Sequence, residues 1–341
     1  MYTYARVVHF SYMHEIQERA KVLTASPKGI LAADESTGSA EKRLAEYGIS
    51  GGEAMRRNFR ELFLTAPGAE RFLTGVILYE ETLTQTARDG RSFVSLLSER
   101  GIMPGIKVDT GTEPFSENSD ELVTKGLEGL SERLAVYRAQ GALFTKWRAV
   151  IRIDENRLPT EDAITENARR LGEYARLVQE AGMVPMLEPE VLLEGNHSIA
   201  RSEEVLTHTL KETCAAAKKA GADLSALIIK TSMALSGSAS GVKDSPADVA
   251  TYTLRALRAS VPEEVPGIVF LSGGQSTDQA TENLAEIRTL GKDAPWTLTF
   301  SYARALQDEA LRAWGGQDEN IGEAQSVFLE RLRKVSEAGN E

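Results

Sequence analysis

The segment from residue 142 to residue 187 decides the fold, because it begins with ALFTK (142–146) and ends with VPML (184–187). Both are short, continuous apolar runs of the kind that form strands covered by helices. Between them Thr160, followed by Glu161 and Asp162, is a typical helix N-cap with acids in the first turn. The interval is long enough for a strand, a turn and a return helix. The segment therefore predicts a strand–helix–strand unit.

Runs of this kind recur along the whole chain, most of them followed by a stretch with helical periodicity. Eight can be counted: Gly29–Ala33, Gly75–Leu78, Met103–Val108, Ala142–Lys146, Val184–Leu187, Leu227–Lys230, Gly267–Leu271 and Trp296–Phe300. The pattern predicts an α/β fold, a single (β/α)8 TIM barrel over residues 1–341. A helical extension is expected over about 1–28 and a tail over about 317–341. A doubly wound open sheet remains the alternative, although no dinucleotide fingerprint or P-loop supports it.

Several helix boundaries can be predicted. Apolar residues between Ser119 and Gly141 are spaced by four, three, four and three, which predicts a helix ended by Gly141. Ser202, before two glutamates, is expected to cap another helix. Ser245-Pro246 places proline at a first helical position, and Ser276 with Gln279 fits a capping box.

Composition excludes several classes of protein. The net charge is −11, from 50 acidic and 39 basic residues, which argues against a nucleic-acid partner. The single cysteine, Cys214, rules out an intramolecular disulfide and favours a reducing compartment, with inert core packing as its expected role. Residues 1–28 lack the pattern of a secretory signal, and no apolar window reaches the ~18 residues of a membrane helix. We expect a cytoplasmic protein with no membrane partner.

Polar residues end most of the predicted strands, where barrel enzymes carry their reacting groups. Most lysines are solvated, but an apolar lead runs straight into Lys230 and another into Lys146. Burial favours the neutral amine of a lysine and makes it a usable nucleophile, and a second ammonium nearby acts in the same direction. Glu188 and Glu190 are two residues apart, so they share one face of a strand, as do Lys146 and Arg148.

The acids could instead cap a strand beside positive groups, but so many charges in a barrel mouth favour function. The four histidines, His9, His14, His197 and His208, form no ligand cluster, and one thiol cannot supply a zinc site. The sequence therefore predicts no metal and no other cofactor. Without a metal to polarise a ketone, a protonated Schiff base on lysine is the available electron sink, which predicts a carbon–carbon lyase.

Three segments have the features of anion sites. The stretch from Ser36 to Lys42, followed by Arg43, opens a helix after the first strand. The Ser272-Gly273-Gly274 turn follows the seventh strand, and Ser301 with Arg304 follows the eighth, where barrels commonly bind phosphate. Ordinary capping and turn geometry would explain the serines and glycines equally well. Separated anion sites suggest a substrate phosphorylated at both ends.

The chain resembles the class I fructose-bisphosphate aldolases from about Lys28 to Gly316. The motifs that carry the resemblance are GILAADESTGS (29–39), GVILYEETL (75–83), GIKVDTG (105–111), TKWR (145–148), VPMLEPE (184–190), LSGGQS (271–276) and TFSYARALQ (299–307). The resemblance implies a barrel enzyme, commonly tetrameric, that uses a Schiff base and no metal. Its expected reaction is the reversible cleavage of fructose 1,6-bisphosphate to dihydroxyacetone phosphate and glyceraldehyde 3-phosphate, in glycolysis and gluconeogenesis.

The resemblance also implies roles for individual residues. Lys230 would form the Schiff base and Glu188 would move protons, with support from Asp34, Lys146 and Glu190. Lys107 and Arg148 would contact substrate. The phosphates would be held by Ser272, Gly273, Ser301, Arg304 and Arg43, with Ser36 and Ser39 in the first loop.

The chain differs from the family pattern at three places. Thr231 follows the lysine where proline is usual, and Ala303 stands where glycine is common and would be strained at a positive φ. The last aromatic residue is Phe328, whereas animal members end in a tyrosine that enters the site. Two other functions remain open, a transaldolase with the same lysine chemistry and a non-catalytic sugar-phosphate-binding protein.

Overall fold

The computed structural model describes residues 2–117, 119–154 and 157–339. The strands are β1 (Gly29–Ala33), β2 (Leu73–Leu78), β3 (Met103–Lys107), β4 (Thr112–Pro114), β5 (Leu122–Thr124), β6 (Phe144–Ile151), β7 (Val184–Val191), β8 (Ile228–Thr231), β9 (Gly267–Phe270) and β10 (Thr297–Tyr302). The α-helices are α1 (Tyr2–Leu23), α2 (Thr37–Glu46), α3 (Glu53–Leu64), α4 (Glu80–Leu83), α5 (Phe93–Glu99), α6 (Leu130–Ala139), α7 (Glu161–Glu180), α8 (Ile199–Ala220), α9 (Pro246–Ser260), α10 (Thr277–Leu290), α11 (Arg304–Trp314) and α12 (Ile321–Glu337).

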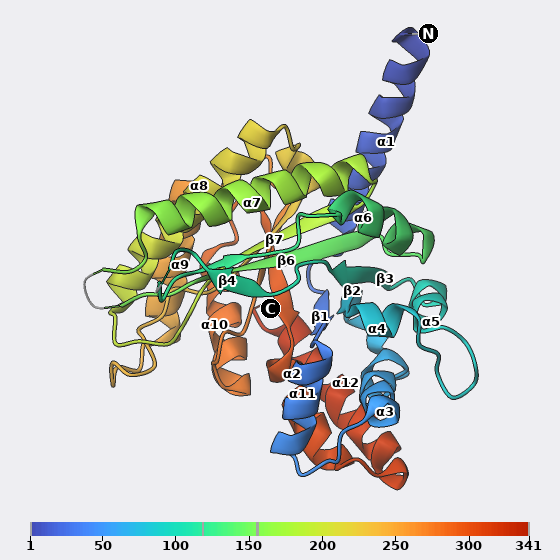
Figure 1. Ribbon diagram of the computed structural model, residues 1–341. Helices are drawn as coiled ribbons and strands as arrows, with labels where there is room; N and C mark the ends of the chain where they lie inside the picture. The colour runs from blue at the N-terminus through green and yellow to red at the C-terminus, as the bar shows by residue number, and fades with distance from the viewer. Residues whose placement is uncertain (1, 118, 155–156, 340–341) are drawn as a thin grey trace.

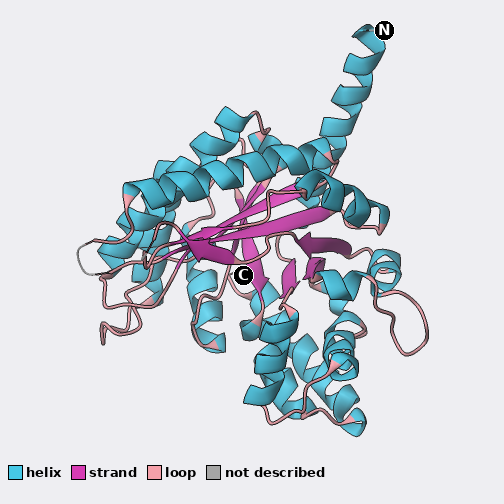
Figure 2. Cartoon of the chain, viewed as in Figure 1, coloured by secondary structure: helices cyan, strands magenta, loops and turns pink. Residues whose placement is uncertain are grey.

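Eight parallel strands form a closed barrel in the order β1-β10-β9-β8-β7-β6-β3-β2, and β2 pairs with β1 to complete the ring. Helices surround the strands (Figures 1 and 2). Closure confirms the TIM barrel and removes the open-sheet alternative. The eight predicted runs coincide with the barrel strands, but β6 and β7 continue to Ile151 and Val191, well beyond their predicted ends. Among the described residues, no helix has the length and apolarity needed to cross a membrane.

The helix predicted between Ser119 and Gly141 is wrong in its first half. Val123 lies in β5, which pairs antiparallel with β4, and the helix α6 begins only at Leu130. Val123 is nevertheless buried, and it falls at the same spacing as the apolar residues of the helix, which is why the sequence pattern included it. Gly126 and Gly129 have positive φ angles of 128° and 61°, which end the hairpin and turn the chain into α6.

The helix caps are mostly as predicted. Thr160, Ser245 and Ser276 each accept a hydrogen bond from a backbone N–H in the first turn of their helix. Ser202 is the exception, because α8 begins four residues earlier and its cap is Ser198. Ser202 lies inside the helix, buried, and its hydroxyl accepts a bond of 3.3 Å from the Leu235 N–H.

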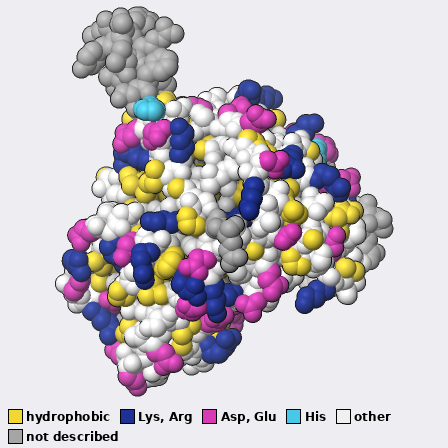
Figure 3. Space-filling view, turned by 180° about the vertical axis from the view of Figure 1, so that it is seen from behind, with side chains coloured by type: hydrophobic (Ala, Val, Ile, Leu, Met, Phe, Trp, Pro, Cys, Tyr) yellow, Lys and Arg dark blue, Asp and Glu magenta, His cyan; other side chains and the backbone are white. Residues whose placement is uncertain are grey.

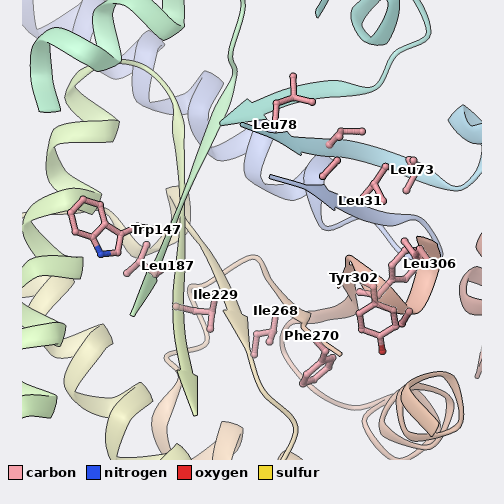
Figure 4. Packing of buried hydrophobic residues seen from close by; sticks show 14 of the residues in the cluster. Leu31, Leu73, Leu78, Trp147, Leu187, Ile229, Ile268, Phe270, Tyr302 and Leu306 are labelled. Carbon is pink, nitrogen blue, oxygen red and sulfur yellow. The ribbon is translucent and has the colours of Figure 1, made fainter. Parts of the chain in front are cut away.

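Side chains point alternately into and out of the barrel along each strand, and apolar residues occupy both the interior and the side that faces the helices. Ile30, Met186 and Ile228 point inward and pack with Leu23 of α1 at the amino-terminal end of the barrel. The outward residues, from Leu31 around to Tyr302, fill the space between the strands and the helices (Figure 4). Cys214 of α8 is also in this outer layer, buried as expected. The inward positions nearer the carboxyl ends are left for other side chains.

The two ends of the chain are helical. The amino-terminal part of α1 projects away from the barrel (Figure 1). Where only a tail was expected, residues 321–337 form α12, and its Phe328 and Leu332 are buried. The buried Arg288 of α10 donates hydrogen bonds to the carbonyls of Val335 and Ser336, which fixes the end of α12.

We expect Gly105→Ala to destabilise the barrel. A Cβ at residue 105 would lie 2.3 Å from the ring of Phe144, which fills the interior beside β3. Overpacking of this kind costs about 1–3 kcal/mol of unfolding free energy. Chemical denaturation measures the loss, and Gly322→Ala in α12 is the matched control, since nothing lies within 4 Å of its added Cβ. Equal stability of the two variants would contradict this account of the interior packing.

Candidate active site

Four charged side chains meet inside the carboxyl-terminal end of the barrel. Lys146, Glu188 and Lys230 occupy inward positions on the adjacent strands β6, β7 and β8, each two residues beyond an inward apolar residue. Glu188 lies between the two lysines, with Oε1 3.0 Å from Lys230 Nζ and Oε2 3.1 Å from Lys146 Nζ. Asp34, directly after β1, places Oδ2 2.7 Å from Lys146 Nζ. All four are sequence-predicted residues, and the fold brings them into direct contact.

The electrostatics of this cluster follow from burial and opposite charge. Lys146, Glu188 and Lys230 are only 3–4% exposed. Burial alone would lower the pKa of Lys146, but Asp34 and Glu188 outweigh it and hold that pKa above its ordinary value. Burial likewise opposes ionisation of Glu188 and Asp34, yet the lysines lower the pKa of both carboxyls. The charged forms of Lys146, Asp34 and Glu188 are therefore stabilised by their neighbours in this buried cluster.

A second set of charges lies beside the first on β3, β6 and β7. Arg148 pairs with Glu190, two residues beyond Lys146 and Glu188 on the same strand faces. Lys107 Nζ lies 2.6 Å from Oδ1 of Asp109, whose Oδ2 accepts a bond of 3.3 Å from the Arg148 N–H. Asp109 is a site residue that sequence reasoning missed. Asp109 is two residues after Lys107, just as Glu190 is two residues after Glu188, and this spacing could have identified it.

The candidate phosphate residues lie on the other side of Lys230, at the carboxyl ends of β9, β10 and β1 or in the segments that follow them. Ser272 follows β9 and is buried, and Gly273 has a φ of +49° in the turn that comes next. Ser301 points inward from β10, 1% exposed, and its hydroxyl has no hydrogen-bond partner among the described residues. Arg304 starts α11 with an exposed side chain.

The first loop is placed against the same side. Ser36 caps α2, and its hydroxyl lies 3.0 Å from that of Ser39. Arg43 is buried on α2 and forms an ion pair with Asp308 of α11. Asp308 is another residue that the sequence did not identify, and it joins the helix after β1 to the helix after β10.

The two substitutions in the family pattern are accommodated. Ala303 has a φ of −104°, so the strain expected for a positive φ is absent. Thr231 is completely buried in β8, one residue after the inward-facing Lys230. Its side chain therefore points toward the helix layer and away from the charged cluster.

Glu35 is a third acid that the sequence did not single out. Its Oε1 is buried with no hydrogen-bond partner among the described residues. Burial and the neighbouring Asp34 carboxylate raise the pKa of Glu35 to about 7, against the opposing charges of Arg43 and Arg60. Between about pH 4.5 and pH 7, the folded protein therefore holds a proton at Glu35 that the unfolded chain has released.

We expect Glu35→Gln to stabilise the protein at pH 8 and to have little effect on stability at pH 4. As pH rises from about 4.5 to about 7, the unfolded chain releases the Glu35 proton before the folded protein does, so wild-type stability falls over that window. A neutral glutamine avoids this loss, which reaches up to about 3 kcal/mol above pH 7. Melting temperatures of the two proteins across pH 4–8 measure the difference. A constant difference at all pH values would contradict the assignment.

Histidines and carboxylates form no metal-type cluster in residues 2–117, 119–154 and 157–339. His208 pairs with Glu161 on the surface, and His197 is buried. The side chain of His9 lies outside the described part of the chain. Basic and acidic side chains are interspersed over the face seen in Figure 3.

Comparison with known proteins adds independent information. The family model described as fructose-bisphosphate aldolase class-I matches residues 15–341. The fructose-bisphosphate aldolase 4, cytosolic, of Arabidopsis thaliana is 45% identical over 325 residues, which is 95% of this chain and 82% of the relative. A probable fructose-bisphosphate aldolase class 1 of Xanthomonas campestris is 43% identical over 94% of this chain and 96% of its own length.

A solved structure has the same fold. It is the fructose-bisphosphate aldolase from Plasmodium falciparum, solved in complex with TRAP and a small-molecule inhibitor. The two chains superpose with a TM-score of 0.94 at 40% sequence identity, over 96% of this chain and 95% of the other.

Proposed function

The chain belongs to the class-I fructose-bisphosphate aldolases, and from that membership we propose that it cleaves fructose 1,6-bisphosphate through a Schiff base on Lys230. The observation that carries the proposal is the position of Glu188 between Lys230 and Lys146 in a buried site. A carboxylate 3.0 Å from the nucleophilic nitrogen can take its proton directly.

In the proposed reaction, Glu188 accepts a proton from Lys230, whose amine then attacks the ketone carbon of the substrate. Glu188 returns protons as the carbinolamine loses water and becomes the iminium. The iminium withdraws the electron pair of the bond between the third and fourth carbons, and Glu188 or Asp34 removes the proton of the fourth-carbon hydroxyl. The aldehyde leaves, the enamine is protonated, and water releases dihydroxyacetone phosphate.

The other charges have supporting roles in this proposal. Lys146 stays protonated because Asp34 and Glu188 raise its pKa, so it supplies a fixed positive charge beside developing oxyanions. Glu190 orients Arg148, which with Lys107 would contact substrate on one side of Lys230. Ser36, Ser39, Arg43, Ser272, Gly273, Ser301 and Arg304 would bind phosphate on the other side. Charges on both sides suit a substrate phosphorylated at both ends.

The wider role is also proposed. Relatives from Arabidopsis and spinach are named cytosolic or cytoplasmic aldolases, which supports a cytoplasmic enzyme of glycolysis and gluconeogenesis. A homotetramer without a metal or other cofactor is expected from the family. Sedimentation of the purified chain tests the tetramer, and activity in the presence of a chelator tests the independence from metals.

Borohydride trapping tests the mechanism. Incubation with dihydroxyacetone phosphate and borohydride should reduce the imine to a stable adduct, and peptide mass spectrometry should place the adduct on Lys230. An adduct on Lys146 or Lys107 would overturn the assignment of the nucleophile while leaving the aldolase reaction itself in place. Loss of activity on chelation would overturn the metal-free mechanism.

A further inference from the structure

His197 is a buried polar residue that the proposed reaction does not use. It lies in the loop between β7 and α8, and its side chain is 6% exposed. The Leu235 backbone interacts with the ring, but neither ring nitrogen has a hydrogen-bond partner of good geometry among the described residues, which is rare for a buried imidazole. Burial lowers the pKa of His197, opposed in part by the hydrogen-bonding interaction of the ring with the Leu235 backbone, so the ring is neutral. One nitrogen can interact with Leu235, and the other is available to a further partner.

The ring faces a small cavity with further unused hydrogen-bonding capacity. The volume in which the centre of a water molecule can lie is about 10 Å³, which is close to the minimum that one water needs. Its lining includes Ser232 and Gln275. The Ser232 hydroxyl donates a bond of 2.7 Å to the Val191 carbonyl, which leaves its oxygen free to accept. Among the described residues, the hydrogen bond of the Gln275 Nε2 is a long one of 3.6 Å to the sulfur of Met233.

The cavity lies between the carboxyl ends of three neighbouring strands of the barrel and the loops that follow them. Val191 and His197 come after the Glu188 position of β7, and Ser232 is two residues after Lys230 of β8. Gly273 and Gln275 belong to the turn after β9, directly beyond Ser272. A group that bridges these loops would control the distance from Lys230 to the turn at Ser272 and Gly273.

We infer that His197 is a positioning residue, which hydrogen-bonds through one buried water to Ser232 and Gln275 and so holds the turn after β9 in place beside Lys230. The inference rests on the proposed role of Ser272 and Gly273 in binding phosphate. The water satisfies the imidazole and has enough polar partners to be retained. His197 itself touches no substrate.

The position of the turn predicts which substrate is affected. Lys230 attacks the second carbon of the ketose, so the phosphate on the first carbon must lie close to Lys230. The β9 turn is beside β8, on the side of the Ser272 and Ser301 residues. Misplacing this turn should weaken binding of dihydroxyacetone phosphate, which carries that phosphate. Glyceraldehyde 3-phosphate carries the distal phosphate and should be unaffected.

The test is the condensation reaction of His197→Leu, with each substrate varied in turn. We expect the KM for dihydroxyacetone phosphate to rise about five- to tenfold, as for loss of a buried hydrogen-bond bridge, with the KM for glyceraldehyde 3-phosphate unchanged. His197→Gln can still bond to the water and should restore much of the affinity. His208→Leu, on the surface of α8, is the control and should behave as wild type in both KM values.

Three results would overturn the inference. They are an equal rise in both KM values, a loss of stability with normal KM values, and identical behaviour of the leucine and glutamine variants. Ser272→Ala separates this proposal from the proposed phosphate-binding role of the β9 turn, on which it rests. If Ser272→Ala leaves the KM for dihydroxyacetone phosphate unchanged, the assignment of phosphate to the β9 turn has failed. If it raises that KM and His197→Leu does not, only the role of His197 has failed.

Discussion

Replacing Lys230 with methionine is expected to lower kcat on the order of 10⁵-fold or more, as for removal of other covalent nucleophiles. Methionine keeps an unbranched chain of similar length but has no amine, so it cannot form the imine that accepts the electrons of the breaking bond. Lys146 still pairs with both Asp34 and Glu188, so the barrel should remain folded. The measurement is the rate of fructose 1,6-bisphosphate cleavage, coupled to reduction of dihydroxyacetone phosphate.

Lys243→Met is the matched control for this variant. Lys243 is exposed in the loop after β8, and its replacement should leave the rate unchanged. The Lys230 variant should also give no adduct in the trapping experiment. Retention of more than about a hundredth of the wild-type rate would show that another lysine performs the covalent step, since general acid–base help alone contributes about 10²–10⁴-fold.

Glu188→Gln has the second largest expected effect, a fall in kcat of about 10²–10⁴-fold. The amide keeps the size of the side chain but cannot accept the Lys230 proton or return it to the carbinolamine. Substrate affinity should change much less than kcat, because Glu188 lies between the two lysines and not among the proposed phosphate contacts. Single-turnover kinetics would locate the loss in the steps around imine formation.

The same variant should lose stability at neutral pH by about 1–3 kcal/mol, because two buried ammonium groups lose a charged acceptor. The lysines lower the pKa of Glu188 in the folded protein. The contribution of the Glu188 charge to the free energy of unfolding is therefore complete above the ordinary glutamate pKa, and it disappears as pH falls through the lowered pKa. The wild type and the variant should therefore converge in acid. Glu194→Gln, at an exposed position after β7, is the control. A stability difference that persists unchanged into acid would contradict the charge pairing.

The sequence predicted the barrel well because each strand begins with an apolar run between helices. It placed the ends of β6 and β7 too early because charged inward residues interrupt the runs, while the ladder between Arg148–Glu188 and Ile151–Val191 continues. It also extended a helix through the β4–β5 hairpin. There a buried strand residue, Val123, happens to fall in phase with the apolar face of α6.

Some residues of the candidate site could likewise be predicted from the sequence, and others could not. Lys146, Glu188 and Lys230 could be identified from strand ends and two-residue spacing, and those signals are local. The partners Asp109 and Asp308 were missed for different reasons. Asp109 had a local signal that was overlooked, whereas Asp308 meets Arg43 only because α11 and α2 are neighbours in the closed barrel. The exposed or buried state of Glu35 and His197 is likewise set by distant loops.

The closed ring has a consequence for how the molecule matures. Ile30 of β1 pairs with Ser301 of β10, so the first strand cannot complete its ladders until nearly the whole chain has left the ribosome. Joining segments so far apart costs chain entropy before any pairing is gained, which makes such a topology slow to fold. Asp34 at the end of β1 reaches Lys146 only in that closed state. Recovery of enzymatic rate during refolding would therefore time the closing of the barrel.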